Sequence, residues 1–203
     1  MMGRNYSLLL ASRSPRRAEL LKQIGVDFEV RVADVVELRA EGETPENFVL
    51  RLAREKACCV WEQAQAETRS VAVLGADTIV TLHGEVYGKP LDYDDALSMW
   101  AKLSGATHDV YTAVTLCYDN EIHVALSKNK VSFRTLSLPE QKAYWRSGEP
   151  CDKAGGYAIQ GLGAIFVKRL EGSFSGVMGL PLYETASLLT QINVYSVLDS
   201  YYE

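Results

Sequence analysis

The sequence has no apolar run long enough to cross a membrane, and its first residues show no long apolar segment of the kind found in signal peptides. Histidines are also few, and the three present are His83, His108 and His123. They lie far apart and form no H-E-x-x-H pattern, so the sequence does not indicate a zinc hydrolase of that type. We therefore expect no membrane association and no zinc site.

Cysteine is equally scarce. The four cysteines are Cys58, Cys59, Cys117 and Cys151. No two of them form a C-x-x-C pair, which argues against a structural zinc site and against a disulfide framework. A reducing compartment fits this pattern best, so we expect a cytoplasmic location.

Basic residues do not outnumber acidic ones. The chain has 21 Lys and Arg residues against 26 Asp and Glu, a net charge of −5. This balance argues against broad binding to nucleic acid or to a membrane surface, and an anionic ligand would need a local basic pocket. No linker or repeat divides the 203 residues, of which 47% are apolar, so we expect a single domain spanning residues 1–203.

Residues 8–25 hold the most informative local pattern. Residues 8–10 form a short apolar run typical of a central strand. Ser14 and Pro15 suit the N-cap and the first position of a helix, and Gly25 suits its end. The sequence therefore predicts a strand, a tight turn and a helix whose N-terminus lies at that turn.

Hydroxyl and basic side chains gather in the turn. Ser12 and Ser14 add hydroxyl groups to the free amides of the helix N-terminus. Arg13, Arg16 and Arg17 place three cations against the positive end of the helix dipole, which is unfavourable for the helix alone. A bound polyanion such as a triphosphate would remove this conflict. The alternative is a solvated first turn whose arginines pair with acids elsewhere.

Two ionisable residues lie in apolar surroundings. Lys56 falls near the centre of the apolar stripe of a helix that starts at residues 44–45. It is either a cation that reaches into a phosphate site or a lysine that snorkels at the helix rim. Asp77 stands within the apolar stretch 71–82, where a carboxylate needs a partner or a cation. It is either a functional group or the cap of a turn.

The remaining pattern alternates strands and helices. We expect strands at residues 26–32, 71–82 with a break at Gly75, 107–118, 122–135 and 164–170. Helices are expected from residues 44, 92, 137 and 182 onward. Gly161 and Gly163 lack the third glycine of a dinucleotide fingerprint, so NAD binding is not supported. The early alternation followed by long antiparallel-looking strands predicts an α/β fold with a mixed sheet.

Short motifs occur in order along nearly the whole chain. They are LASRSPRR at residues 10–17, GADT at 75–78, GKP at 88–90, LSG at 103–105, DKAG at 152–155, AIQG at 158–161 and VMGLP at 177–181. Together they resemble the Maf family of nucleotide pyrophosphatases. The resemblance implies a mixed, largely antiparallel, elongated sheet flanked by helices, with two lobes around a cleft, similar to inosine triphosphate pyrophosphatase.

The resemblance also implies an activity and a set of roles. It implies hydrolysis of a nucleoside triphosphate to the monophosphate and pyrophosphate, with Mg²⁺ or Mn²⁺, commonly by a homodimer. The family's general base matches Asp77, and Glu37 joins Asp77 as a metal ligand. The matching phosphate-binding cations are Arg16, Arg17, Lys56 and Lys89.

Substrate choice follows from further matched positions. The positions that sort the branches by base are Arg16, Thr78 and Gln160. They match the branch that acts on dTTP and UTP, with modified pyrimidine triphosphates as further candidates. Together with Ser12 and Ser14 they complete the expected substrate site. The alternative is a nucleotide-binding regulator of cell division or septum formation that turns over little substrate.

Overall fold

A long mixed β-sheet forms the body of the molecule in the computed structural model, which describes residues 6–67, 70–194 and 196–198. Its seven strands are β1 (Ser7–Ala11), β2 (Glu29–Val30), β3 (Val71–Leu82), β4 (Glu85–Tyr87), β5 (Thr107–Tyr118), β6 (Glu121–Phe133) and β7 (Val167–Glu171). The strand order is β2-β1-β3-β5-β6-β7, and β4 pairs with the end of β3. Among the described strands, only the pairings of β1 with β2 and β3 are parallel, which confirms a mixed, largely antiparallel sheet.

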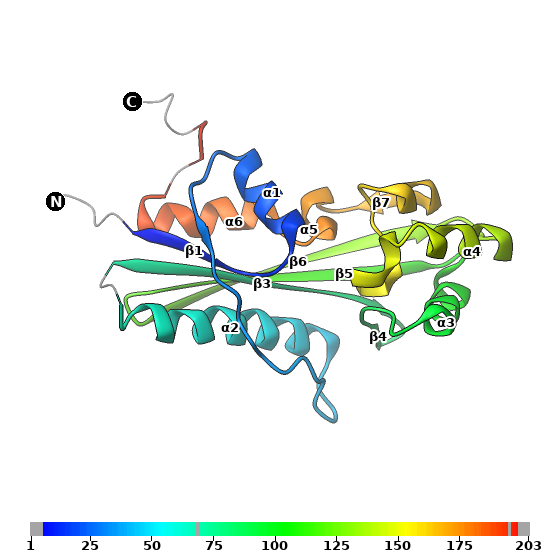
Figure 1. Ribbon diagram of the computed structural model, residues 1–203, viewed down its shortest axis with the longest axis horizontal. Helices are drawn as coiled ribbons and strands as arrows, with labels where there is room; N and C mark the ends of the chain where they lie inside the picture. Colours follow the sequence, from blue (N-terminus) through cyan, green and yellow to red (C-terminus); the bar gives the residue numbers. More distant parts are fainter. Residues whose placement is uncertain (1–5, 68–69, 195, 199–203) are drawn as a thin grey trace.

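Helices cover both faces of this sheet. They are α1 (Pro15–Gln23), α2 (Pro45–Ala64), α3 (Tyr93–Leu103), α4 (Leu138–Arg146), α5 (Phe174–Met178) and α6 (Leu182–Leu189). Helix α2 runs along one face, whereas α1 and α6 lie on the other (Figure 1). Within the described residues, none of these helices combines the length and the apolar character needed to span a membrane.

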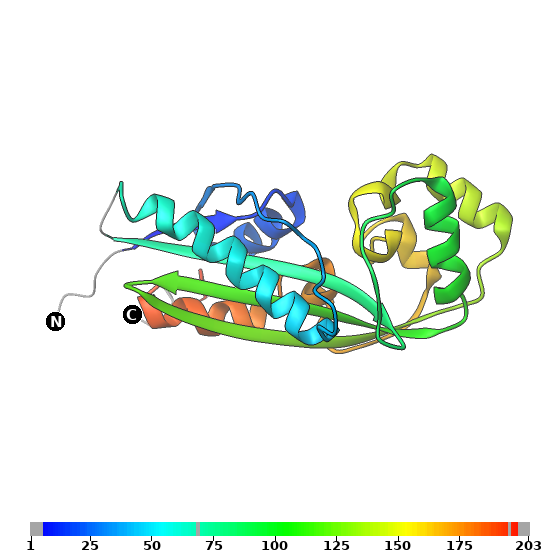
Figure 2. The ribbon, with the colours of Figure 1, turned by 90° about the horizontal axis from the view of Figure 1, so that it is seen from below.

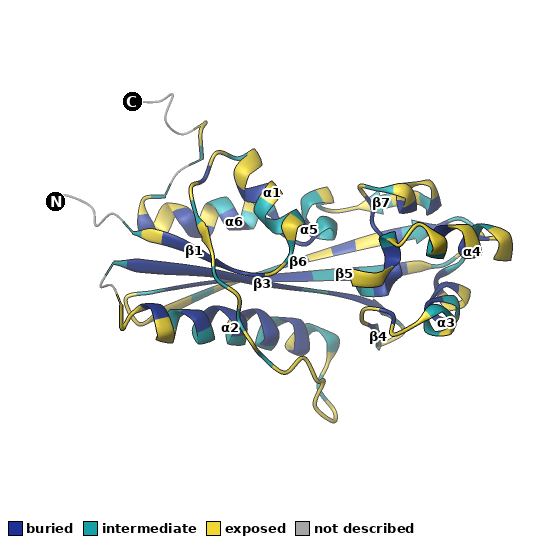
Figure 3. Cartoon of the chain, viewed as in Figure 1, coloured by how far each residue is buried: buried dark blue, intermediate teal, exposed yellow. Residues whose placement is uncertain are grey.

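Strand β1 is buried on both faces, which explains its uninterrupted apolar run. Leu8 and Leu10 belong to the core cluster under α1 and α6, while Leu9 and Ala11 belong to the cluster under α2. Neighbouring β3 is buried in the same way along nearly its whole length (Figure 3). A strand that meets helices on both sides has no polar face, so its sequence does not alternate.

A second group of helices lies at one end of the long strands. Helices α3 and α4 pack there with the short helical turns of residues 149–166 (Figure 2). Their own core is aromatic and centres on Trp100, Tyr144 and Phe166. The molecule thus has two lobes, as the family resemblance implied.

Local signals at the helix ends agree with the structure. Thr44 accepts a hydrogen bond from the amide of Asn47 at the start of α2, and Asp92 does the same for Asp95 at the start of α3. Helix α4, which was expected from residue 137 onward, begins with a capping box formed by Ser137 and Glu140. These caps satisfy amides that a helix cannot pair internally.

Several strand predictions need correction. The strand expected at residues 26–32 is reduced to Glu29–Val30, an exposed pair at the edge of the sheet. The strand at 164–170 begins only at Val167, because residues 162–166 form a helical turn. Helix α5 was not predicted, since five residues are too short for a periodic pattern.

The break expected at Gly75 is also wrong, because β3 passes through it without interruption. A Cβ atom at this position would lie 2.7 Å from the carbonyl oxygen of Ala53 and 2.7 Å from the amide nitrogen of Ala57. Glycine is therefore needed here for the close approach of α2 to the strand.

Candidate functional site

A pocket of about 690 Å³ opens between the two lobes. It is lined by the turn between β1 and α1, by the middle of α2 and β3, by residues 88–89 and by loops 152–160 and 177–179. Its volume lies in the usual range for small-molecule sites. Every residue assigned to the site from the sequence lines it: Ser12, Ser14, Arg16, Arg17, Glu37, Lys56, Asp77, Thr78, Lys89 and Gln160.

Asp77 and Lys56 form a buried ion pair on the floor of this pocket. The ammonium nitrogen of Lys56, on α2, lies 2.5 Å from Oδ1 of Asp77, in the middle of β3. Both side chains are about nine-tenths buried. The contact depends on the close approach of α2 at Gly75, because Ala53 and Ala57 flank Lys56 on the helix.

Burial raises the pKa of the Asp77 carboxyl, although the charges of Lys56 and Arg17 oppose this effect. A carboxylate in this setting holds its charge at a cost and gains by taking up a proton. That property suits a general base. Asp77 is therefore no simple turn cap, and Lys56 does not snorkel to solvent.

Glu37 lies in the loop after β2 and reaches the same ammonium group. Its Oε1 is 2.5 Å from Nζ of Lys56, and its side chain is 45% exposed. Partial burial would raise the pKa of Glu37, but the hydrogen bond and charge of Lys56 hold it below its ordinary value. One lysine thus bridges two carboxylates that come from distant parts of the sequence.

Arg17 points into the protein and not along the helix into solvent. Its guanidinium donates to the carbonyl oxygens of Gly179 (2.7 Å) and Ala76 (2.8 Å) and to the hydroxyls of Ser12 (3.1 Å) and Thr78 (3.1 Å). Burial lowers its pKa, although the charge of Asp77 opposes this effect. The four contacts tie the β1–α1 turn, β3 and the loop at Gly179 together. They hold both neighbours of Asp77, so the phosphate contact expected of Arg17 stays a prediction.

Hydroxyl groups are organised around this arginine. Ser12 also accepts a hydrogen bond from the backbone amide of Ser14 at 3.2 Å. Thr78 accepts another from the hydroxyl of Thr112 at 3.0 Å. The hydroxyls of Ser12 and Thr78 are therefore held in fixed positions along the pocket wall, as binding groups require.

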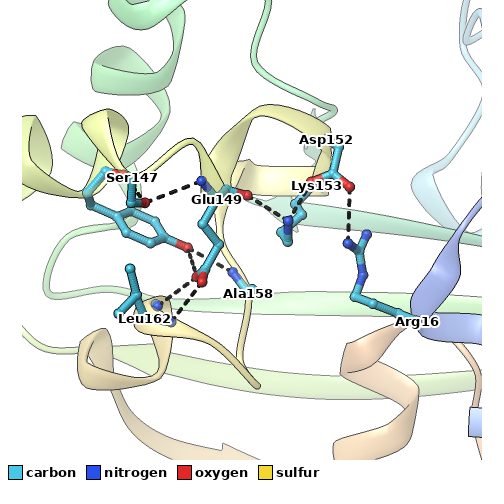
Figure 4. Close-up of polar contacts among 9 residues, drawn as sticks. Arg16, Ser147, Glu149, Asp152, Lys153, Ala158 and Leu162 are labelled. Carbon is cyan, nitrogen blue, oxygen red and sulfur yellow. Dashed lines mark hydrogen bonds and ion pairs between the residues drawn. The ribbon is translucent and has the colours of Figure 1, made fainter. Parts of the chain in front are cut away.

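The remaining predicted residues lie at the pocket rim. Arg16 pairs with Asp152 across the opening at 3.2 Å (Figure 4). Lys89 is exposed, and no ion pair joins it to another residue of the described ranges. Gln160 is exposed as well and borders the pocket. Lys89 and Gln160 are therefore open to an incoming ligand, whereas Arg16 would have to exchange its contact with Asp152.

Asp152 lines the pocket but was not among the predicted site residues. It belongs to the DKAG motif, but nothing in the local pattern showed that it would meet Arg16 from 136 residues away. Its carboxylate is also bonded to Lys153, whose ammonium donates to the backbone carbonyl of Glu149 at 2.6 Å. The contact between Asp152 and Arg16 therefore becomes visible only in the folded structure.

The carboxylates present suit a hard divalent cation. Across the described residues, no group of three or more His, Cys, Asp or Glu side chains could enclose a metal by itself. Asp77 and Glu37, however, contact one nitrogen atom, so they lie close enough to share a single cation. Mg²⁺ is typically held by one or two carboxylates together with substrate phosphates and water. The donor set fits that arrangement and contains neither of the Cys and His ligands that predominate in zinc sites.

A protein-family model described as Maf-like protein matches residues 7–192. The chain belongs to the Maf family. Three curated Maf relatives, each named dTTP/UTP pyrophosphatase, illustrate the similarity. The relative from Pseudoalteromonas atlantica is 49% identical over 92% of this chain and 97% of its own length. That from Saccharophagus degradans is 50% identical (92% and 89%), and that from Vibrio cholerae is 51% identical (90% and 96%).

Among solved structures, the Staphylococcus aureus Ham1 protein resembles this Maf chain at a TM-score of 0.42 and 17% identity. The match covers 63% of this chain and 71% of that protein. So partial a likeness carries no conclusion about function.

Proposed function

We propose that this Maf protein hydrolyses dTTP and UTP to the nucleoside monophosphate and pyrophosphate. The observation that carries the proposal is the pocket in which Asp77, Lys56 and Glu37 meet beside the basic turn of α1. Relatives of about half identity over nine-tenths of the chain bear the name dTTP/UTP pyrophosphatase, which supports the choice of substrate.

The turn before α1 provides the phosphate site in this proposal. Its free amides and the positive end of the helix dipole favour an anion, and Ser14 adds a hydroxyl. Arg16 and Lys89 border the same pocket, and their cationic side chains can contact the phosphate oxygens. Placed around the leaving group, such cations stabilise the charge that develops on pyrophosphate.

Asp77 would take the proton of the attacking water. The water oxygen forms a bond to the α-phosphorus, the bond to the bridging oxygen of the β-phosphate breaks, and pyrophosphate leaves with that electron pair. The raised pKa of Asp77 suits this role, because a base is most effective when its pKa is close to the working pH. Lys56, freed from one carboxylate, can donate to a phosphate oxygen.

We further propose Mg²⁺ or Mn²⁺ as cofactor, held by Asp77 and Glu37. The bound cation supplies charge neutralisation at the phosphates and orientation of the water. In the free protein the ammonium of Lys56 contacts both carboxylates and offsets part of their negative charge.

Base selection is assigned to Gln160, with Thr78 and Arg16. A carboxamide donates and accepts, so it can match an adjacent N–H and carbonyl of uracil or thymine. Cytosine presents an amine and an unprotonated ring nitrogen there, so one group would be left unpaired. Discrimination of about ten- to a hundredfold is expected from such a mismatch.

The proposal is tested by a pyrophosphate-release assay of the purified chain with dTTP, UTP, CTP and the purine triphosphates, in Mg²⁺ and in Mn²⁺. Release from dTTP and UTP in preference to the others supports it. Tight binding of dTTP without release would instead support the nucleotide-binding regulator. We also propose that the protein is a homodimer, as the family resemblance implies, and sedimentation equilibrium of the same protein tests this.

A further inference from the structure

Glu149 points inward at the start of the helical turn that follows α4. Its carboxylate accepts three hydrogen bonds: from the hydroxyl of Tyr144 (2.6 Å) and from the backbone amides of Leu162 (2.9 Å) and Gly163 (3.0 Å) (Figure 4). Partial burial would raise its pKa, but these donors hold the pKa below its ordinary value. The group is therefore a well-bonded carboxylate that touches no part of the pocket floor.

Tyr144 and Glu149 together fix both ends of the loop that carries Gln160. The amide of Ala158 donates to the Tyr144 hydroxyl at 3.0 Å, and Glu149 holds the amides of Leu162 and Gly163. Gln160 lies between these two anchors with its side chain exposed at the pocket. Anchored ends restrict where the carboxamide can point.

Glycine at 161 and 163 gives independent evidence that this clamp is built in. A Cβ atom at Gly161 would lie 2.2 Å from Oε2 of Glu149, and one at Gly163 would lie 2.6 Å from the hydroxyl of Tyr144. Neither glycine has a positive φ, so turn geometry does not require them. A side chain at Gly161 would displace the Glu149 carboxylate, and one at Gly163 would meet both the Tyr144 hydroxyl and the backbone oxygen of Ala158, at 2.8 Å.

The backbone of Glu149 also leads to the second base-selecting residue. Its carbonyl oxygen accepts from Lys153, Lys153 pairs with Asp152, and Asp152 pairs with Arg16 (Figure 4). One short turn thus connects Arg16 of one lobe with the Gln160 loop of the other.

We propose that Glu149 is a positioning residue for base selection: its three hydrogen bonds, shared with Tyr144, hold the 158–163 loop so that Gln160 meets the pairing edge of the pyrimidine. The inference rests on the proposed hydrolysis of dTTP and UTP. Glu149 itself touches no substrate. Its loss frees the loop, so ordering Gln160 then costs part of the binding energy.

The test compares kcat and KM for dTTP, UTP and CTP in Glu149→Gln, Gln160→Ala and the double variant. Glu149→Gln keeps the shape of the side chain but replaces one carboxylate oxygen with an NH2 group. This group cannot accept a hydrogen bond, so the variant cannot satisfy all three donors. We expect its KM for dTTP and UTP to rise about tenfold with kcat little changed, and its UTP-to-CTP ratio of specificity constants to fall about tenfold. The double variant should show no further fall in the UTP-to-CTP ratio, because the two substitutions remove the same interaction, that of Gln160 with the base.

Two matched variants guard against a trivial loss of structure. Glu140→Gln disturbs the cap of α4 in the same lobe without touching the loop, and it should leave the base ratio unchanged. Tyr144→Phe removes only the bridging hydroxyl and should lower the ratio in the same direction, which keeps the test open if Glu149→Gln does not fold. Rescue of the ratio in Glu149→Asp would add support.

An unchanged UTP-to-CTP ratio in Glu149→Gln, or additive losses in the double variant, would overturn the inference while wild-type activity on dTTP stands. A wild-type protein that releases no pyrophosphate would overturn the proposed function first, and the inference with it.

Discussion

Nζ of Lys56 lies 2.5 Å from Oδ1 of Asp77 and 2.5 Å from Oε1 of Glu37, so one buried ammonium forms ion pairs with two carboxylates in the free protein. Removing it leaves the Asp77 charge without its main partner. Such a loss costs more than the pair itself contributes, because the remaining charge stays buried.

Lys56→Met should therefore destabilise the protein in a pH-dependent manner. Burial already raises the pKa of Asp77, and loss of Lys56 raises it further. At a pH above that raised pKa, Asp77 is charged in the folded protein. Its charge is buried there but solvated in the unfolded chain, so the folded state is destabilised. Below the ordinary aspartate pKa of about 4, both states are protonated and this cost disappears. We expect a loss of about 2 kcal/mol at pH 8 that shrinks toward pH 5, measured by urea unfolding.

The matched control is Lys128→Met, which breaks the ion pair between Lys128 and Glu46. Both of these side chains are about half exposed. Such a surface pair contributes at most about 1 kcal/mol. A loss in Lys56→Met that equals the control, or that does not change with pH, would show that Asp77 does not depend on the ammonium.

Arg17→Met should destabilise the fold as well as the activity. The guanidinium donates to the backbone oxygens of Ala76 and Gly179, and methionine leaves both without it. A buried acceptor left unpaired costs about 1–3 kcal/mol, so the loss of these two partly buried contacts should lower the free energy of unfolding by at most about 6 kcal/mol. Arg13→Met, at an exposed position of the same turn, should change it by less than about 0.5 kcal/mol. Equal effects of the two changes would favour a purely ligand-facing Arg17.

Gly75→Ala should separate α2 from β3. The added methyl group would meet the backbone of Ala53 and Ala57 at 2.7 Å, and backbone atoms cannot rotate away. Overpacking of this kind costs about 3 kcal/mol. The thermal midpoint should fall, and the activity should fall further because Lys56 moves with the helix. At Gly88 a Cβ meets nothing within 4 Å, so Gly88→Ala serves as the stability control. A tolerated Gly75→Ala would show that the helix can shift without loss.

The sequence predicts the elements that depend on local chemistry. Caps at Thr44 and Asp92 and the turn of β1 into α1 are readable because side chains next to each other in sequence form them. The strand expected at residues 26–32 failed because its length depends on partners in the sheet, and β2 has only β1 beside it. The role of Gly75 was predicted wrongly because glycine is needed there to admit helix α2, which lies about twenty residues away in sequence.

Within the site, burial and periodicity single out Lys56 and Asp77, but they do not show that the two meet. Nor does any local pattern reveal that Arg17 turns inward or that Asp152 lies opposite Arg16. Glu149 escapes such analysis altogether, because a lone glutamate after a glycine is an ordinary surface residue until its donors are known. These relationships exist only once the two lobes are in place.

The most direct test of the account is the kcat/KM for pyrophosphate release from dTTP by Asp77→Asn. The amide keeps the shape of the side chain but removes the charge that would take the proton of water. We predict a fall of at least about a hundredfold with the fold retained by circular dichroism. Asp109→Asn, on β5 and outside the pocket lining, should keep wild-type activity. An Asp77→Asn variant that hydrolyses dTTP within a few fold of the wild-type rate would contradict the central claim that Asp77 activates the water.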